Sequence, residues 1–243
     1  MGRSFGDLFG DTFNEYTKKF IPILKIFVFL YFIPLIVISI LLVVIFAGAF
    51  SSLGVSLLKT GSVDLSQIVL DQGSAGFSVL LFIGIFLFVI ALGVFYVLAT
   101  VSYIYTGFSK PENLSFDKTF AFARKNFWRY AGLALLTIVC LIPLYMLLII
   151  PGIIFTVFWI FSSYIFLSGN NGAWESMKQS KVLVKGKWWR VFGYGLLLSV
   201  IIIVISLVLK FVPFLGSIVS SLVITPFMIL FFKNFYIDLK KNR

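Results

Sequence analysis

The sequence predicts an all-α fold: a polytopic membrane helix bundle of six transmembrane helices with interfacial amphipathic helices between them. The chain of 243 residues is 60% hydrophobic and only 12% charged, and 30 of its residues are phenylalanine. A soluble domain carries about twice that charged fraction. The apolar runs are long enough to cross a bilayer as helices, whereas barrel strands would give shorter, alternating segments. The composition therefore excludes an ordinary soluble domain.

Alternating apolar and basic stretches define the elements in order. Uncharged runs of membrane-spanning length predict transmembrane helices, and stretches rich in cations and aromatic residues predict interfacial helices. Amphipathic helices are expected at 1–20, 113–126 and 171–187. Transmembrane helices are expected at 23–50, 76–108, 127–150, 152–169, 188–209 and 211–233. An external loop at 51–75 and a basic tail at 234–243 complete a single membrane domain.

Prolines and lysines within or beside the apolar runs carry further expectations. Pro34 predicts a kink in the first span. Pro151-Gly152 predicts the turn between the third and fourth spans, because proline ends a helix and glycine permits a turn. Lys25 and Lys233 lie near the ends of spans, where a lysine can extend its ammonium group to the membrane surface.

The basic residues fall almost entirely on one side of the predicted membrane. If both termini face the cytoplasm, every Lys and Arg except Lys59 and Lys210 lies on the cytoplasmic side. This asymmetry follows the positive-inside rule and predicts a multi-pass protein of the cell membrane with cytoplasmic N- and C-termini. It also explains the net charge of +11 through anionic lipid head groups, without nucleic acid.

The polar stretch from Asn171 to Arg190 separates two uncharged runs in the C-terminal half. At helical spacing, one side gathers large apolar side chains and the stem of one lysine: Trp174, Met177, Lys181, Val184 and Trp188. This pattern predicts an amphipathic helix in the membrane interface that leads into a Trp-rich entry to the fifth span.

One unit, an amphipathic basic segment followed by a membrane hairpin, occurs three times. KNFWRYAGLALL, from Lys125, aligns with GKWWRVFGYGLL, from Gly186, and superimposes their Trp-Arg dipeptides. A weaker alignment sets TFNEYTKKF, from Thr12, over TFAFARKNF, from Thr119. The alternative is that any interfacial helix before a span carries aromatic residues and cations as anchors.

The candidate lipid head-group or partner contacts are the cations and tryptophans at these anchor points. They are Lys181, Lys185, Lys187, Trp188, Trp189, Arg190, Arg124, Lys125, Trp128 and Arg129. Cations attract anionic lipid head groups, and tryptophan rings settle at the level of those groups. The expected partners are therefore membrane lipids. A membrane-protein partner or a homo-oligomer is the alternative, and plain anchoring explains any one of these residues.

The residue inventory predicts no enzyme, no metal site and no cofactor. The chain has no histidine, a single cysteine at 140, and nine acidic residues without paired-carboxylate or metal-ligand spacing. The function expected first is a non-enzymatic membrane module that binds lipid or a partner. The alternative is a permease or transporter subunit for a hydrophobic or amphipathic substrate, because no ionisable residue is expected near the middle of a span.

The run from Pro151 to Phe192 resembles the signature of the YciC-like multipass membrane proteins, which are related to the membrane domain of bacterial glycerophosphodiester phosphodiesterases. The matching elements are Pro151-Gly152, Ser180, Lys185-Gly186, Trp189-Arg190 and Phe192. The resemblance implies a membrane module without hydrolase activity, because those phosphodiesterases carry catalysis in a separate soluble barrel. An acid that often ends the preceding helix in such relatives is replaced by Gly169, so no role of that acid is transferred.

Overall fold

The computed structural model describes residues 2–40, 43, 72–209 and 215–242. Among these residues every regular element is a helix and no strand occurs, which confirms the all-α fold class. Six helices in this part of the chain are long and apolar enough to cross a membrane. They are Phe20–Ile40, Phe82–Phe108, Phe116–Leu147, Ile149–Ser168, Trp188–Val208 and Leu222–Lys241. The chain is therefore a multi-pass membrane protein, as the sequence predicts.

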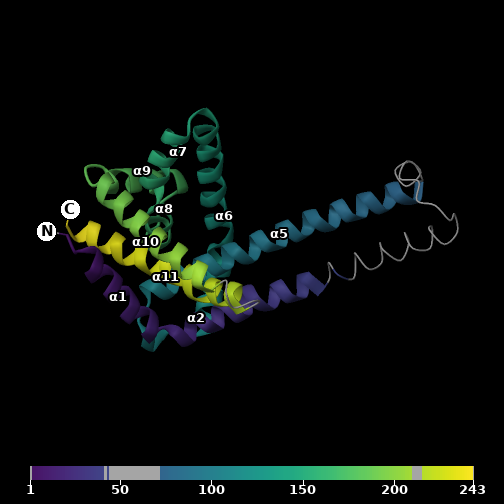
Figure 1. Cartoon of the computed structure of the whole chain (residues 1–243), viewed down its shortest axis with the longest axis horizontal. Coiled ribbons are helices and arrows are strands. Elements are labelled where there is room, and N and C mark those ends of the chain that lie inside the picture. The colour runs from purple at the N-terminus through teal and green to yellow at the C-terminus, as the bar shows by residue number, and fades with distance from the viewer. Residues whose placement is uncertain (1, 41–42, 44–71, 210–214, 243) are drawn as a thin grey trace. The chain divides into compact units, whose positions relative to one another are not determined.

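The sequence predicts one membrane domain, and the chain divides into two compact units: Val28–Tyr96, and Met1–Phe27 together with Val97–Arg243. The second, larger unit contains the end of α5 (Gln72–Phe108) and the elements α1 (Phe5–Lys18), α2 (Phe20–Phe27), η2 (Pro111–Asn113), α6 (Phe116–Leu147), α7 (Ile149–Trp159), α8 (Ser162–Ser168), α9 (Ala173–Val184), α10 (Trp188–Leu209) and α11 (Leu215–Lys241). Figure 1 shows both chain ends beside each other, where α1 and α11 meet.

The smaller unit holds the π-helix η1 (Val28–Phe32), a helix at 33–40 and the first part of α5. The π-helix lies directly before Pro34, whose missing N–H cannot continue the regular hydrogen-bond ladder. The sequence predicts a kink at Pro34, and the feature found beside it is this π-helix. The predicted loop at 51–75 lies outside the described residues up to 71, and α5 already begins at Gln72.

The second amphipathic segment and the third span form one uninterrupted helix, α6. The prediction of two elements, 113–126 and 127–150, is wrong in this respect. The helix starts after Ser115, whose hydroxyl accepts a hydrogen bond from the Lys118 N–H at 3.3 Å. No proline lies between the polar and the apolar part of α6. The one glycine there, Gly132, is tolerated within the helix.

The break between the third and fourth spans also differs from the prediction. The chain turns at Leu148, which has an extended backbone, and α7 begins at the next residue. Pro151 and Gly152 lie inside the first turns of α7. Proline is tolerated there, because the first N–H groups of a helix have no partner within the helix.

The fourth span, predicted as one helix at 152–169, is interrupted between α7 and α8. The Phe161 N–H donates to Ser180 Oγ of α9 at 3.2 Å, and Ser180 Oγ donates to the Phe158 carbonyl at 2.6 Å. A side chain inserted into the helical ladder is one of the identifiable causes of a kink. Ser180 therefore replaces the missing backbone partners at the interruption.

The predicted basic tail at 234–243 is for the most part helix and core. Helix α11 continues to Lys241, and Phe235, Tyr236 and Leu239 are buried within it. This stretch is held by α1, which packs along α11. The tail prediction is wrong because it considered only the cations at the end of the segment. The apolar residues between them pack into the core of the larger unit.

Helix α9 buries a different face from the predicted one. Met177 and Val184 are buried as expected, but the Trp174 side chain is 53% exposed. Ser176 and Ser180 occupy the buried face in its place. Small hydroxyl-bearing residues let two helices approach closely, and Ser180 is required at the interruption of the fourth span.

One position of the predicted repeat has similar burial in all three units. One alignment superimposes Thr12 on Thr119, and the register of the other, continued six residues towards the N-terminus, places Ser180 at the same position. All three are buried hydroxyl residues. Thr12 and Thr119 each donate to the carbonyl four residues earlier, at 2.7 and 2.9 Å. The junction with the following span differs in each unit: a bend after Lys18, a continuous helix in α6, and a turn at Gly186, where φ is 82°.

Candidate functional site

The two Trp-Arg pairs that align in the repeat also stand in similar surroundings. Trp128 on α6 is 82% exposed and Trp189 on α10 is 79% exposed. Each neighbouring arginine lies over an aromatic ring of another helix: Arg129 at 5.2 Å from a ring of α8, and Arg190 at 5.5 Å from a ring of α11. An exposed tryptophan beside a cation is the arrangement found at the level of lipid head groups.

The predicted contact cations on α6 have no acidic partner. Arg124 and Lys125 are exposed. Arg129 contacts only neutral amides in its polar interactions, the side chains of Asn126 and Asn170, both at 3.5 Å. None of the ion pairs within the described residues includes a residue of α6. Unpaired cations on one helix give it a positive potential that attracts anions.

The predicted residues in and after α9 divide between surface and packing. Lys181 is exposed, and its ammonium group lies 5.2 Å from the ring of Phe155. Lys185 is exposed at the C-terminal end of α9. Trp188 is partly buried, and its indole N–H donates to the Ile154 carbonyl at 3.3 Å. We use the term unpaired basic surface for Arg124, Lys125, Arg129, Lys181 and Lys185 together. They form two groups: the first three lie in the first half of α6, and Lys181 lies over the rings of Phe155 and Phe158 in α7.

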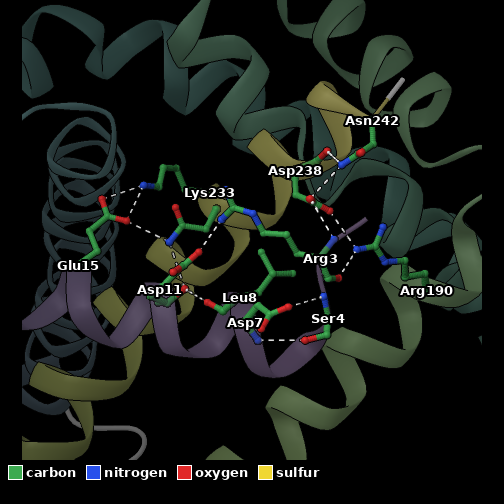
Figure 2. A network of polar contacts seen from close by, with 12 residues as sticks. Arg3, Ser4, Asp7, Leu8, Asp11, Glu15, Arg190, Lys233, Asp238 and Asn242 are labelled. Carbon is green, nitrogen blue, oxygen red and sulfur yellow. Dashed lines mark hydrogen bonds and ion pairs between the residues drawn. The ribbon is translucent and has the colours of Figure 1, made fainter. Parts of the chain in front are cut away.

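Two other predicted contacts are used inside the protein. Arg190 pairs with Asp238 at 3.0 Å, and its guanidinium donates to the Arg3 carbonyl at 2.6 Å. Lys187 donates to the Asn242 carbonyl at 3.0 Å. Figure 2 shows Arg190, Arg3 and Asp238 converging from three segments. These cations tie α10 to both ends of the chain, which sets them apart from the unpaired basic surface.

A second charged site, which the sequence did not predict, lies between α1, α5 and α11. The Glu15 carboxylate accepts hydrogen bonds from Lys19 at 2.7 Å and from Lys233 at 2.6 Å (Figure 2 shows the latter). Asn234 donates to the same carboxylate at 3.0 Å and to the Thr12 hydroxyl at 3.1 Å. The side chains of Lys19 and Lys233 are only 5% and 6% exposed. We call Glu15, Lys19, Lys233 and Asn234 the buried charge cluster.

Lys19 links the buried charge cluster to the end of α5. Its ammonium group donates to the carbonyls of Thr106 at 2.7 Å and Gly107 at 2.9 Å. The last carbonyls of a helix lack partners within the helix and carry partial negative charge. Burial raises the pKa of Glu15, but the charges and hydrogen bonds of Lys233 and Lys19 outweigh it, so the pKa lies below its ordinary value. The carboxylate is therefore charged at neutral pH.

The expectation that Lys233 extends to the membrane surface is wrong. Its ammonium group pairs with an acid 218 residues earlier in the chain. A signal for half of the cluster was present, because Glu15 and Lys19 stand four residues apart on a helix, the spacing of a helical ion pair. The partner of Lys233 could not be inferred without knowing that α1 packs on α11.

The buried charge cluster holds helices together through satisfied hydrogen bonds and ion pairs. Glu15 accepts from three donor residues, and the three N–H groups of Lys19 all have acceptors. Within the described residues, no group of three or more His, Cys, Asp or Glu side chains could hold a metal ion.

Comparisons of this chain with protein-family models, with curated proteins and with solved structures give no match. The function is accordingly argued from the two sites themselves. One is the unpaired basic surface on α6 and α9, and the other is the buried charge cluster that holds α1 against α5 and α11.

Proposed function

We propose that this chain is a non-enzymatic membrane module whose unpaired basic surface binds the head groups of anionic lipids. The supporting observation is how the cations are divided. Arg3, Lys19, Arg190 and Lys233 have carboxylate partners, whereas the cations of the unpaired basic surface have none among the described residues. Exposed lysines such as Lys18 and Lys240 also lack a carboxylate partner there, and what sets the surface apart from them is the exposed Trp128 beside Arg129. A cation near an anionic membrane surface contributes about 1 kcal/mol. Five of them can hold lipid head groups without a dedicated pocket.

The same proposal places the chain in the cell membrane with both termini in the cytoplasm. The two ends lie together, since the Arg3 N–H donates to Asp238 at 3.2 Å, and an even number of spans returns the chain to its starting side. The positive-inside pattern then favours the cytoplasm for that side. The resemblance of Pro151–Phe192 to YciC-like proteins fits a membrane module of this kind.

Four charge-neutralising substitutions test the proposal. The variant carries Arg124→Gln, Lys125→Gln, Lys181→Gln and Lys185→Gln. The control carries four glutamines at exposed lysines elsewhere in the larger unit: Lys18, Lys110, Lys240 and Lys241. Both variants lose the same net charge. Each protein is reconstituted in vesicles of equal parts phosphatidylcholine and phosphatidylglycerol, extracted in mild detergent, and assayed by native mass spectrometry for retained lipid.

We expect the first variant to retain less phosphatidylglycerol than wild type by at least about tenfold, since four contributions of about 1 kcal/mol are removed. The control should stay close to wild type. Equal losses in both variants would mean that net charge alone attracts lipid. Unchanged retention in the first variant, with an acidic protein bound instead, would turn the proposal toward a partner protein.

A second candidate function is a permease for a hydrophobic or amphipathic substrate. The observation in its favour is the interrupted fourth span, with a cavity of about 270 Å³ between α6 and α7–α8. Interrupted helices near the middle of a bundle are common in transporters. Movement of a fluorescent amphipathic solute across vesicles that contain the purified protein, and its absence in empty vesicles, would favour this candidate over the first.

A further inference from the structure

The cavity beside the interrupted fourth span is the feature of the larger unit that neither site above explains. It has a volume of about 270 Å³ and lies between two walls. One wall is the segment of α6 from Leu133 to Leu141, and the other includes Trp159, Ile160 and Ser162 at the junction of α7 and α8. The interruption that Ser180 holds open therefore coincides with the position of the cavity.

The lining of the cavity suits hydrocarbon. No charged residue lines it, and most of its side chains are apolar. Three of the four hydroxyl groups that line it already donate to helix carbonyls: Thr137 to Leu133 at 2.8 Å, Thr156 to Gly152 at 2.8 Å, and Ser162 to Trp159 at 2.7 Å. The fourth, Ser163, shares a hydrogen bond with the Tyr130 hydroxyl at 3.2 Å. A polar ligand would find few donors there. An apolar occupant loses nothing, because it has no hydrogen bonds to satisfy.

The cavity is continuous with the membrane-facing surface of α6. Ile138 lines the cavity and is also 56% exposed, and Leu135 beside it is 66% exposed. In a span, the medium against such side chains is the hydrocarbon of the bilayer. A void without atoms on one side loses their dispersion contacts, so a lipid chain that enters from the bilayer is favoured over an empty space.

Charge complementarity points to the kind of lipid. Arg129 belongs to the unpaired basic surface and lies one turn before Leu133, where the cavity wall begins. The α6 segment from Arg129 to Leu141 is about 18 Å long at 1.5 Å per residue. Half the hydrocarbon thickness of a bilayer is about 15 Å. A lipid with its head group at Arg129 therefore has a chain long enough to reach the cavity.

We propose that this cavity binds one acyl chain of the anionic lipid whose head group contacts the unpaired basic surface at Arg129. The proposal rests on the proposed function and adds to it a specific site. It also relates the interruption of the fourth span to binding, because the residues at that interruption form one wall of the cavity. It also makes the module selective for lipid that sits on this side of α6.

Filling the cavity tests the proposal. Ala134→Phe places a ring in the cavity from α6, and Ile160→Phe does so from the opposite wall, in case one of the two does not fold. Leu135→Phe is the matched control, since it adds a ring at the neighbouring, exposed position of α6. Phosphatidylglycerol retained after extraction from the mixed vesicles described above is measured by native mass spectrometry, with thermal unfolding as the check of folding.

We expect either cavity-filling variant to retain about tenfold less phosphatidylglycerol than the Leu135→Phe control, the loss that displacing about two methylenes would cause. Full retention in a folded cavity-filling variant, while the four-glutamine variant loses its lipid, would overturn the acyl-chain site and leave the proposed function standing. Full retention in both would overturn the proposed function as well.

Discussion

Replacing Glu15 by glutamine is the sharpest test of the buried charge cluster. Glu15→Gln keeps the shape of the side chain and removes its negative charge. The ammonium groups of Lys19 and Lys233, 5% and 6% exposed, then remain buried without a carboxylate. Removing one partner of a buried ion pair costs about 3–5 kcal/mol. Because Glu15 itself is 18% exposed, we expect the lower end, about 3 kcal/mol.

The chain offers a matched control on the same helix. Arg3 and Asp11 form an ion pair at 2.6 Å, the same separation as Lys233 and Glu15, but their side chains are 46% and 54% exposed. Exposed pairs contribute about 0–1 kcal/mol. Asp11→Asn should therefore cost much less than Glu15→Gln. The two acids share charge, separation and helix, and they differ in burial and in the number of donors, since Glu15 accepts from three residues and Asp11 pairs with Arg3.

The assay is thermal unfolding of the purified protein in detergent, followed by tryptophan fluorescence. A loss of about 3 kcal/mol corresponds to a fall in Tm of about 6–12 °C for a chain of this size. Lys233→Met should cost less than Glu15→Gln, because it leaves Lys19 and Glu15 as a neutral pair. If Glu15→Gln and Asp11→Asn lowered Tm equally, the buried charge cluster would not stabilise the packing of α1 more than an exposed ion pair does.

Two further predictions follow from the same contacts. The pKa of Glu15 lies below its ordinary value of 4.5, so the stability that its charge contributes is present above that value and is lost as pH falls through the lowered pKa. The Tm difference between wild type and Glu15→Gln should therefore shrink in acid. A difference that stays constant would contradict this. Ser180→Ala should lower the free energy of unfolding by about 1–3 kcal/mol, because it leaves the Phe161 N–H and the Phe158 carbonyl without their partner. Ser176→Ala is the control, since it removes only a hydrogen bond to a carbonyl four residues earlier, and it should cost about 0.5 kcal/mol. Both are measured by the same thermal assay.

The sequence predicts the spans because they depend on local properties. A run of about 20 apolar residues spans a bilayer wherever it occurs, and all six runs recur as helices in the structure. The similar exposure of Trp128 and Trp189 was implied by aligning two short segments. These inferences needed no knowledge of which helices touch.

The misplaced features depend on contacts between distant segments. The fourth span is interrupted because Ser180, from another helix, supplies partners for Phe158 and Phe161. Pro151, the strongest local signal for a break, is harmless in the first turn of α7. The reading of Lys233 failed for the same reason, since its acid lies on α1. Local patterns give each helix, and packing decides where its ladder breaks and which charges meet.

The ion pairs across long sequence separations gather where α1 meets α11, and the packing of the three amphipathic segments accounts for this. The second and third amphipathic segments each pack on the span that precedes them: Phe122 of α6 stacks on Tyr105 of α5 at 4.5 Å, and α9 packs on α7 and α8. A short loop holds each of them in place. The first segment, α1, has no preceding span in the described chain and packs instead on α11, the last one.

Hydrogen bonds and ion pairs hold α1 against α11, some of them through backbone atoms, such as the Arg3 N–H that donates to Asp238. Both buried or half-buried ion pairs across long sequence separations occur there, Glu15 with Lys233 and Arg190 with Asp238 beside Arg3. The cations on α6 and α9 are not needed to hold those helices, because a short loop links each helix to the span on which it packs. They can therefore remain unpaired, and under the proposed function it is this unpaired basic charge that contacts lipid head groups.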